Sequence, residues 1–158
     1  MAKRWIGTVG LVLVLGAAAC GTDRGPRTIT DTGFVDAANA LCQRELPALR
    51  AERRESDFFG RTDKSDRADV ADRVEQVADR LDDVAGKLGG LPLAAADQGE
   101  VSAWLEEWAN YTGIGRKYAE AVRSEKASVY SDIATEGNAS VRRIADFARA
   151  NRIDRCVL

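Results

Sequence analysis

Carboxylate pairs are the residues of this chain best suited to acid–base chemistry. They occur at three places, Asp82 with Asp83, Glu106 with Glu107, and Asp66 with Asp69. Such chemistry needs two carboxylates held in an apolar cleft, with their pKa values pushed apart. Here each pair falls on the polar face of an expected helix with arginines nearby, as in Asp79-Arg80. We therefore expect these carboxylates to be solvated surface groups.

Other catalytic and metal-binding arrangements are missing from the sequence. The chain has no histidine, which removes histidine-ligated zinc, Ser-His-Asp triads and Cys-His dyads. It also contains no CxxC pair, glycine-rich phosphate loop, nucleophile elbow or calcium-binding loop. We therefore expect no catalytic residue, no metal site and no cofactor, and we predict that the protein is not an enzyme.

Aromatic side chains are concentrated at Trp104, Trp108, Tyr111 and Tyr118. Their spacings of four, three and seven place them on one side of an expected helix. Three interpretations remain open. The rings can fill the core, they can leave a crevice for an apolar ligand near Trp104 and Trp108, or they can form an exposed stripe that docks a partner.

Cys20 ends an apolar run of roughly 15 residues, from Trp5 to Ala19, that follows the basic pair Lys3 and Arg4. This is the layout of an export signal, and the run is short for a membrane-spanning helix. The segment LGAAAC, residues 15–20, resembles the lipobox of bacterial lipoproteins. The resemblance implies cleavage after Ala19 and a diacylglyceryl group with palmitate-type chains on Cys20. The alternatives are an ordinary cleaved signal and an uncleaved anchor.

The other two cysteines form an even pair if Cys20 carries lipid. Disulfides persist in exported proteins, so we predict a bond between Cys42 and Cys156, with two buried free thiols as the alternative. Cleavage after Ala19 would remove 2 of the 23 basic residues and none of the 25 acidic ones, leaving a net charge of about −4. This balance argues against nucleic acid as a partner.

Apolar residues recur at intervals of three and four along most of the remaining sequence, which predicts an all-α protein. Residues 20–31, rich in glycine and polar residues, are expected to be a lipidated cysteine and tether, followed by a helical domain over 32–158. Asp31 or Thr32 is a plausible N-cap for the first helix, which Pro47 either kinks or breaks. Asn151 is expected to end the last helix in the left-handed conformation. The expected helices span about 32–51, 66–88, 97–124 and 127–150.

Four amphipathic helices with short connections can bury their apolar faces only against one another, which predicts an antiparallel four-helix bundle. The segments at residues 34–42, 101–105 and 153–156 resemble small, largely uncharacterised helical lipoproteins of actinobacteria. That resemblance supports the fold, the source and the disulfide, and implies no activity. A glycine often found there before the last segment is replaced here by Arg152.

The sequence thus predicts location in more detail than activity. We expect residues 1–19 to be a signal peptide and the mature protein to be lipid-anchored through Cys20 on the extracytoplasmic face of the cell membrane. The leading hypothesis for its role is a non-enzymatic binding or scaffolding module for another cell-envelope protein. The alternative is a carrier or sensor that holds a small apolar ligand between helices near Trp104 and Trp108.

Overall fold

The computed structural model describes residues 28–55 and 66–158, and within these residues the chain is helical with no β-strand. The all-α prediction is confirmed. The predicted signal peptide, Cys20, residues 21–27 of the tether and the connection at 56–65 lie outside the described residues. The α-helices are α1 (Thr32–Glu55), α2 (Asp66–Gly89), α3 (Gln98–Arg123) and α4 (Tyr130–Ala150), and short 3-10 helices cover Ala95–Asp97, Ala127–Val129 and Asp154–Cys156.

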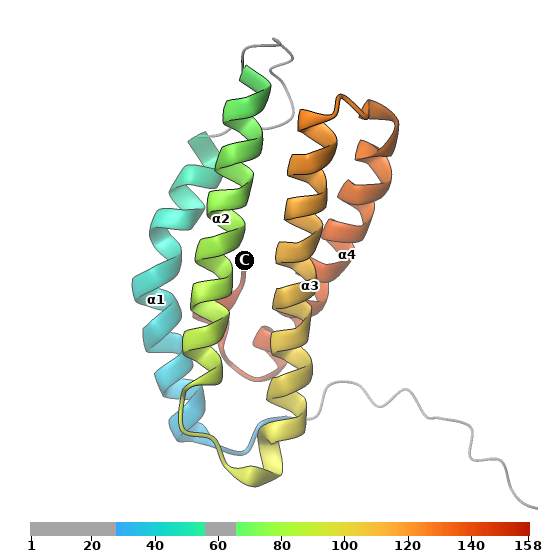
Figure 1. The fold of residues 1–158 in the computed structure, drawn as a ribbon. Helices are drawn as coiled ribbons and strands as arrows, with labels where there is room; N and C mark the ends of the chain where they lie inside the picture. The colour runs from blue at the N-terminus through green and yellow to red at the C-terminus, as the bar shows by residue number, and fades with distance from the viewer. Residues whose placement is uncertain (1–27, 56–65) are drawn as a thin grey trace, which may run out of the picture.

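The helices stand side by side as a bundle in which successive helices run in opposite directions (Figure 1). Helix α3 packs against both α2 and α4, and α1 packs against α2. In the described part of the chain, the backbone of α1 does not come close to α4. Instead it approaches the 3-10 helix Asp154–Cys156. The C-terminal segment therefore folds back between the helices and completes the bundle next to α1 (Figure 1).

The C-terminal segment is fixed by the predicted disulfide. Cys42 and Cys156 are bonded, with their Cα atoms 5.1 Å apart, and both are fully buried. The side chain of Asn39 adds two hydrogen bonds, because its Nδ2 donates to the carbonyl of Arg152 and its Oδ1 accepts from the backbone N–H of Arg155. Arg50 donates to the carbonyls of Arg155 and Val157. Helix α1 thus holds the end of the chain along three of its turns.

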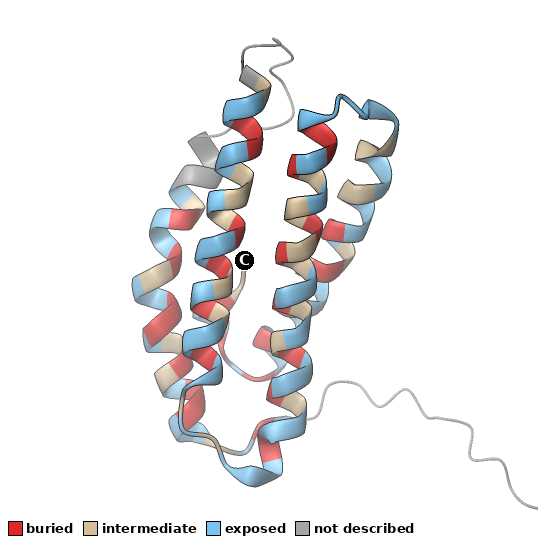
Figure 2. Cartoon of the chain, viewed as in Figure 1, coloured by how far each residue is buried: buried red, intermediate tan, exposed pale blue. Residues whose placement is uncertain are grey.

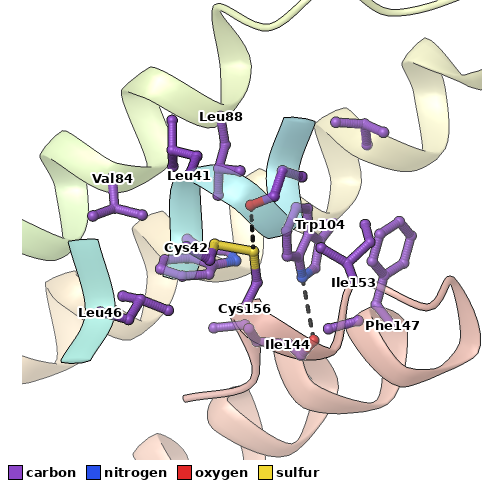
Figure 3. Packing of buried hydrophobic residues seen from close by; sticks show 14 of the residues in the cluster. Leu41, Cys42, Leu46, Val84, Leu88, Trp104, Ile144, Phe147, Ile153 and Cys156 are labelled. Carbon is purple, nitrogen blue, oxygen red and sulfur yellow. Dashed lines mark hydrogen bonds between the residues drawn. A yellow bond between two sulfur atoms is a disulfide. The ribbon is translucent and has the colours of Figure 1, made fainter. Parts of the chain in front are cut away.

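Apolar side chains pack tightly around this disulfide. Figure 3 shows the labelled residues pointing toward one another from all four helices and from the C-terminal segment. Figure 2 shows the same pattern over the whole bundle, with buried residues on the helix faces that are turned inward. The largest fully buried side chains include Trp104, Trp108, Phe34, Leu46, Leu88, Ile144 and Ile153.

Asp31 caps the first helix, in agreement with the sequence-based expectation. Its Oδ1 accepts from the backbone N–H of Phe34 at 3.1 Å, which satisfies a donor that the helix itself leaves unpaired. Its Oδ2 accepts from the N–H of Ala94 at 2.8 Å, in the α2–α3 connection. These bonds, led by that from Phe34, hold the pKa of Asp31 below its ordinary value. The carboxylate therefore stabilises the fold at neutral pH, and this contribution is lost as the pH falls through the lowered pKa.

Within the described residues, packing begins at Ile29, which is 3% exposed and lies three residues before the expected domain boundary. Its N–H donates to Oδ1 of the buried Asn151 at 2.5 Å. One residue later, both the N–H and the hydroxyl of Thr30 donate to Oδ2 of Asp97, and the N–H of Asp31 donates to the same oxygen. A carboxylate and an amide from two distant connections thus hold residues 29–31 against the bundle.

Replacing Asp97 with alanine is expected to lower the free energy of unfolding by about 1–3 kcal/mol, because three donors lose their acceptor at a site that is 5% exposed. Hydrogen exchange at the amides of Thr30 and Asp31 should also become faster. Urea unfolding and amide exchange measure the two effects. Asp36→Ala, at an exposed position of α1, is the control and should change the unfolding free energy by less than about 0.5 kcal/mol. Unchanged exchange in Asp97→Ala would contradict the prediction.

Pro47 does not break α1, which continues from Thr32 to Glu55. Proline removes one N–H from the helix and leaves the carbonyl four residues earlier, that of Gln43, without its donor. Both Pro47 and Gln43 are exposed, so water can hydrate that carbonyl. The sequence left open whether Pro47 kinks or breaks the helix, and the alternative of a break is wrong.

The expected left-handed conformation at Asn151 was also wrong. Asn151 has φ −105°, and the left-handed residue is Arg152, with φ 58°. The Asn151 side chain explains the difference, because it bonds to the N–H of Ile29 and to the carbonyl of Phe147 and is thereby buried. The reversal of the chain then falls on Arg152, in a conformation that carries a steric penalty for every residue but glycine.

Candidate functional site

The four aromatic residues singled out from the sequence divide into two pairs. Trp104 and Trp108 are 2% and 0% exposed and belong to the core around the disulfide. The ring of Trp104 stacks on Phe147 with centroids 5.1 Å apart and meets Trp108 edge-on at 5.7 Å. Its Nε1 donates to the carbonyl of Ile144 at 3.2 Å (Figure 3). These two tryptophans fill the core.

Tyr111 and Tyr118 lie further along α3 and line a pocket of about 260 Å³. The pocket lies between α2, α3 and α4, in the half of the bundle nearer the α3–α4 connection. Neither Trp104 nor Trp108 is among its lining residues, so this hollow is not where the ligand hypothesis expected a crevice. The lining residues are Val74, Val77, Ala78 and Leu81 from α2, Tyr111, Thr112, Ile114, Gly115 and Tyr118 from α3, and Ile133, Ala134, Gly137 and Asn138 from α4.

The wall of this pocket carries no charged side chain. The polar side chains among its lining residues are those of Tyr111, Thr112, Tyr118 and Asn138. The Thr112 hydroxyl already donates to Oδ1 of Asp82 at 2.6 Å. Burying a charged ligand group without a partner costs far more than burying a neutral one. The pocket therefore suits a neutral, mainly apolar molecule.

Burial strengthens the preference of Tyr118 for its neutral form. Desolvation raises the pKa of its phenol, with a smaller contribution from Tyr130, whose ring centroid lies 5.4 Å away. A phenol is already protonated at physiological pH, and the shift moves its pKa further from that range. This neutral phenol is consistent with an uncharged site.

Ion pairs hold α2 against α3 along the outside of the pocket. Arg116 contacts Asp79 at 2.7 Å and Asp82 at 2.6 Å. Two helical turns further along α3, Arg123 contacts Asp72 and Glu75. Hydrogen bonding to Arg123 lowers the pKa of Glu75. Because these groups are largely exposed, each pair adds little stability by itself, but together they fix the register of the two helices that form most of the wall.

The carboxylate pairs are not arranged as catalytic dyads. Asp82 binds Thr112 and Arg116, whereas Asp83 is exposed. Glu107 pairs with Arg143 at 2.8 Å, which lowers the pKa of Glu107, and the adjacent Glu106 is exposed. In both of these pairs one carboxylate bonds to a neighbouring helix and the other faces solvent. Of the third pair, Asp69 is exposed and the side chain of Asp66 lies outside the described residues.

Within residues 28–55 and 66–158 there is no cluster of three or more metal-ligating side chains. None of the helices in these ranges is long and apolar enough to cross a membrane. No protein-family model, curated protein or solved structure matches the chain.

Proposed function

We propose that this protein is a lipid-anchored, non-enzymatic binding module on the extracytoplasmic face of the cell membrane, and that it binds a small, neutral, apolar molecule. The pocket between α2, α3 and α4 is the observation that carries the proposal. Its volume, about 260 Å³, lies just below the usual range for small-molecule sites, and its wall is mostly apolar with a few polar groups. The anchor is supported by the export signal and by the resemblance of residues 15–20 to a lipobox.

The hypothesis of an envelope protein as partner stays a prediction. The pocket favours a small ligand, because a hollow lined by three helices accepts a compact molecule more readily than the surface of another protein.

The experiment compares two fluorescent probes that differ by one charged group. N-phenyl-1-naphthylamine is neutral, and 8-anilino-1-naphthalenesulfonate carries a sulfonate. Both are titrated into residues 21–158 exported behind an ordinary cleavable signal, a form that keeps every described residue and lacks the lipid. We expect saturable binding of the neutral probe and weaker binding of the charged one, because the pocket offers the sulfonate no cation.

Ala134→Leu tests whether the probe occupies this pocket. Ala134 lines the wall, and a leucine there should weaken binding of the neutral probe about tenfold or more. Ala109→Leu, at an exposed position of α3, is the matched control and should bind like the wild type. Absence of saturable binding to the wild type would refute the ligand part of the proposal. The anchor is tested separately, because Cys20→Ser should abolish incorporation of labelled palmitate.

A further inference from the structure

We infer that two helix glycines, Gly115 and Gly137, set the size of the ligand, and that this ligand is a neutral molecule with a flat ring. The inference rests on the proposed function and identifies the residues and the ligand class of the same pocket. Each glycine lies inside a long helix and lines the pocket. Glycine in such a position destabilises a helix by about 1 kcal/mol relative to alanine.

Close packing of the helices does not require glycine at position 115. A Cβ atom placed there would lie 3.8 Å from the Cβ of Ala78 and 3.8 Å from Cγ1 of Val74, which are ordinary contact distances. A methyl group would therefore fit against α2, and it would occupy space that is now part of the pocket. What glycine supplies at this position is open volume at the α3 wall.

Gly137 plays the same part on α4. A Cβ atom there would lie 3.5 Å from Cγ2 of Ile114 and 4.0 Å from Cε2 of Tyr111, again without overlap. Gly137 is buried, so the added methyl would face the interior and not the solvent. Two of the three walls thus have bare backbone where a side chain would fit.

The shape of the wall favours a ring. Ala78 and Ala134 add two further small side chains to the glycines, and the side chains of Tyr111 and Tyr118 contribute aromatic rings two helical turns apart on α3. Aromatic rings gain attraction from one another beyond the burial of area. A flat, uncharged ring can lie against the tyrosines and the bare backbone and gains the attraction between aromatic rings, which an acyl chain lacks.

The test measures binding of N-phenyl-1-naphthylamine to Gly115→Ala and Gly137→Ala in the exported chain of residues 21–158. Each added methyl should weaken binding roughly tenfold or more. The same change should raise the melting temperature by about 4 °C, because alanine favours the helix. Weaker binding with higher stability separates a filled pocket from a damaged fold.

Gly113→Ala is the matched control. Gly113 lies on the same helix, two residues from Gly115, and a Cβ there would have no neighbour within 4 Å. It should raise the melting temperature similarly and leave probe binding unchanged. If Gly115→Ala and Gly137→Ala bind like the wild type, or if Gly113→Ala weakens binding equally, the role assigned to the two glycines is overturned while the pocket stands. If the wild type binds no probe, both proposals fail.

The ligand class is tested by competition. Naphthalene, a neutral ring compound, should displace the probe, whereas 1-monolauroylglycerol, a neutral molecule with an acyl chain, should displace it at least about tenfold less effectively. More effective displacement by the monoacylglycerol would overturn the assignment to rings.

Discussion

Breaking the Cys42–Cys156 disulfide is expected to lower the free energy of unfolding by about 4–5 kcal/mol. The bond joins residues separated by 114 positions. In the chain-entropy model, a cross-link stabilises by restricting the unfolded chain, and the effect grows with the length of the loop that it closes. The loss matches a large share of the 5–15 kcal/mol that typically separates folded from unfolded domains.

Urea unfolding of the Cys42→Ala/Cys156→Ala variant, compared with the oxidised wild type, measures this effect. Alanine is preferable to serine because both cysteines are fully buried and a hydroxyl there would need a partner. A reductant should shift the wild-type curve toward that of the variant and leave the variant itself unchanged. Coincident curves for the variant and the oxidised wild type would show that the bond does not stabilise the fold.

Replacing Trp104 with alanine should cost about 3–5 kcal/mol, the usual range for truncating a large buried aromatic side chain. Trp104 is 2% exposed, and its ring contacts both Trp108 and Phe147. The substitution also leaves the carbonyl of Ile144 without its indole donor. The cavity would form beside the disulfide, where the core is continuous and cannot easily collapse.

Urea unfolding again gives the measurement. Glu106→Ala, on the exposed face of the same helix, serves as control and should change the unfolding free energy by less than about 0.5 kcal/mol. Trp104→Phe should lie between the two, because it keeps an aromatic ring against Phe147 but loses the N–H. A loss below about 1 kcal/mol for Trp104→Ala would mean that Trp104 is not part of the core's stability.

Much of the fold could be predicted because the apolar periodicity of each helix is strong and local. On α2 apolar residues recur at spacings of four and three, a pattern that predicts one continuous buried stripe made of Val70, Val74, Val77, Leu81, Val84 and Leu88. The structure buries this stripe except at Val74 and Val77, which are half-buried. These two valines line the pocket. The periodicity identified the inward face but carried no information on where that face would remain unfilled.

The remaining features depend on contacts between residues far apart in the sequence. Nothing near Asp97 or Asn151 indicates that their side chains would bind residues 29–31, since the partners lie 66 to 122 positions away. The sequence shows Gly115 only as a residue that weakens its helix. The sequence could not show which helix packs against Gly115 or how close that helix comes, because both depend on the packed structure. The pocket was therefore found at Tyr111 and Tyr118 and not beside the tryptophans.

The attachment of residues 29–31 has a mechanical consequence for a protein pulled by its N-terminus. Tension applied to the N-terminal end of the described chain reaches Ile29 and Thr30 first, where Asn151 from the end of α4 and Asp97 from the start of α3 resist it together. Both contacts must therefore break before the force acts on the first turn of α1. Further along α1, the disulfide between Cys42 and Cys156 links the middle of the helix covalently to the C-terminal segment, so the two cannot separate at that point. A bundle built this way should withstand force applied at its N-terminal end better than force applied at the α3–α4 connection.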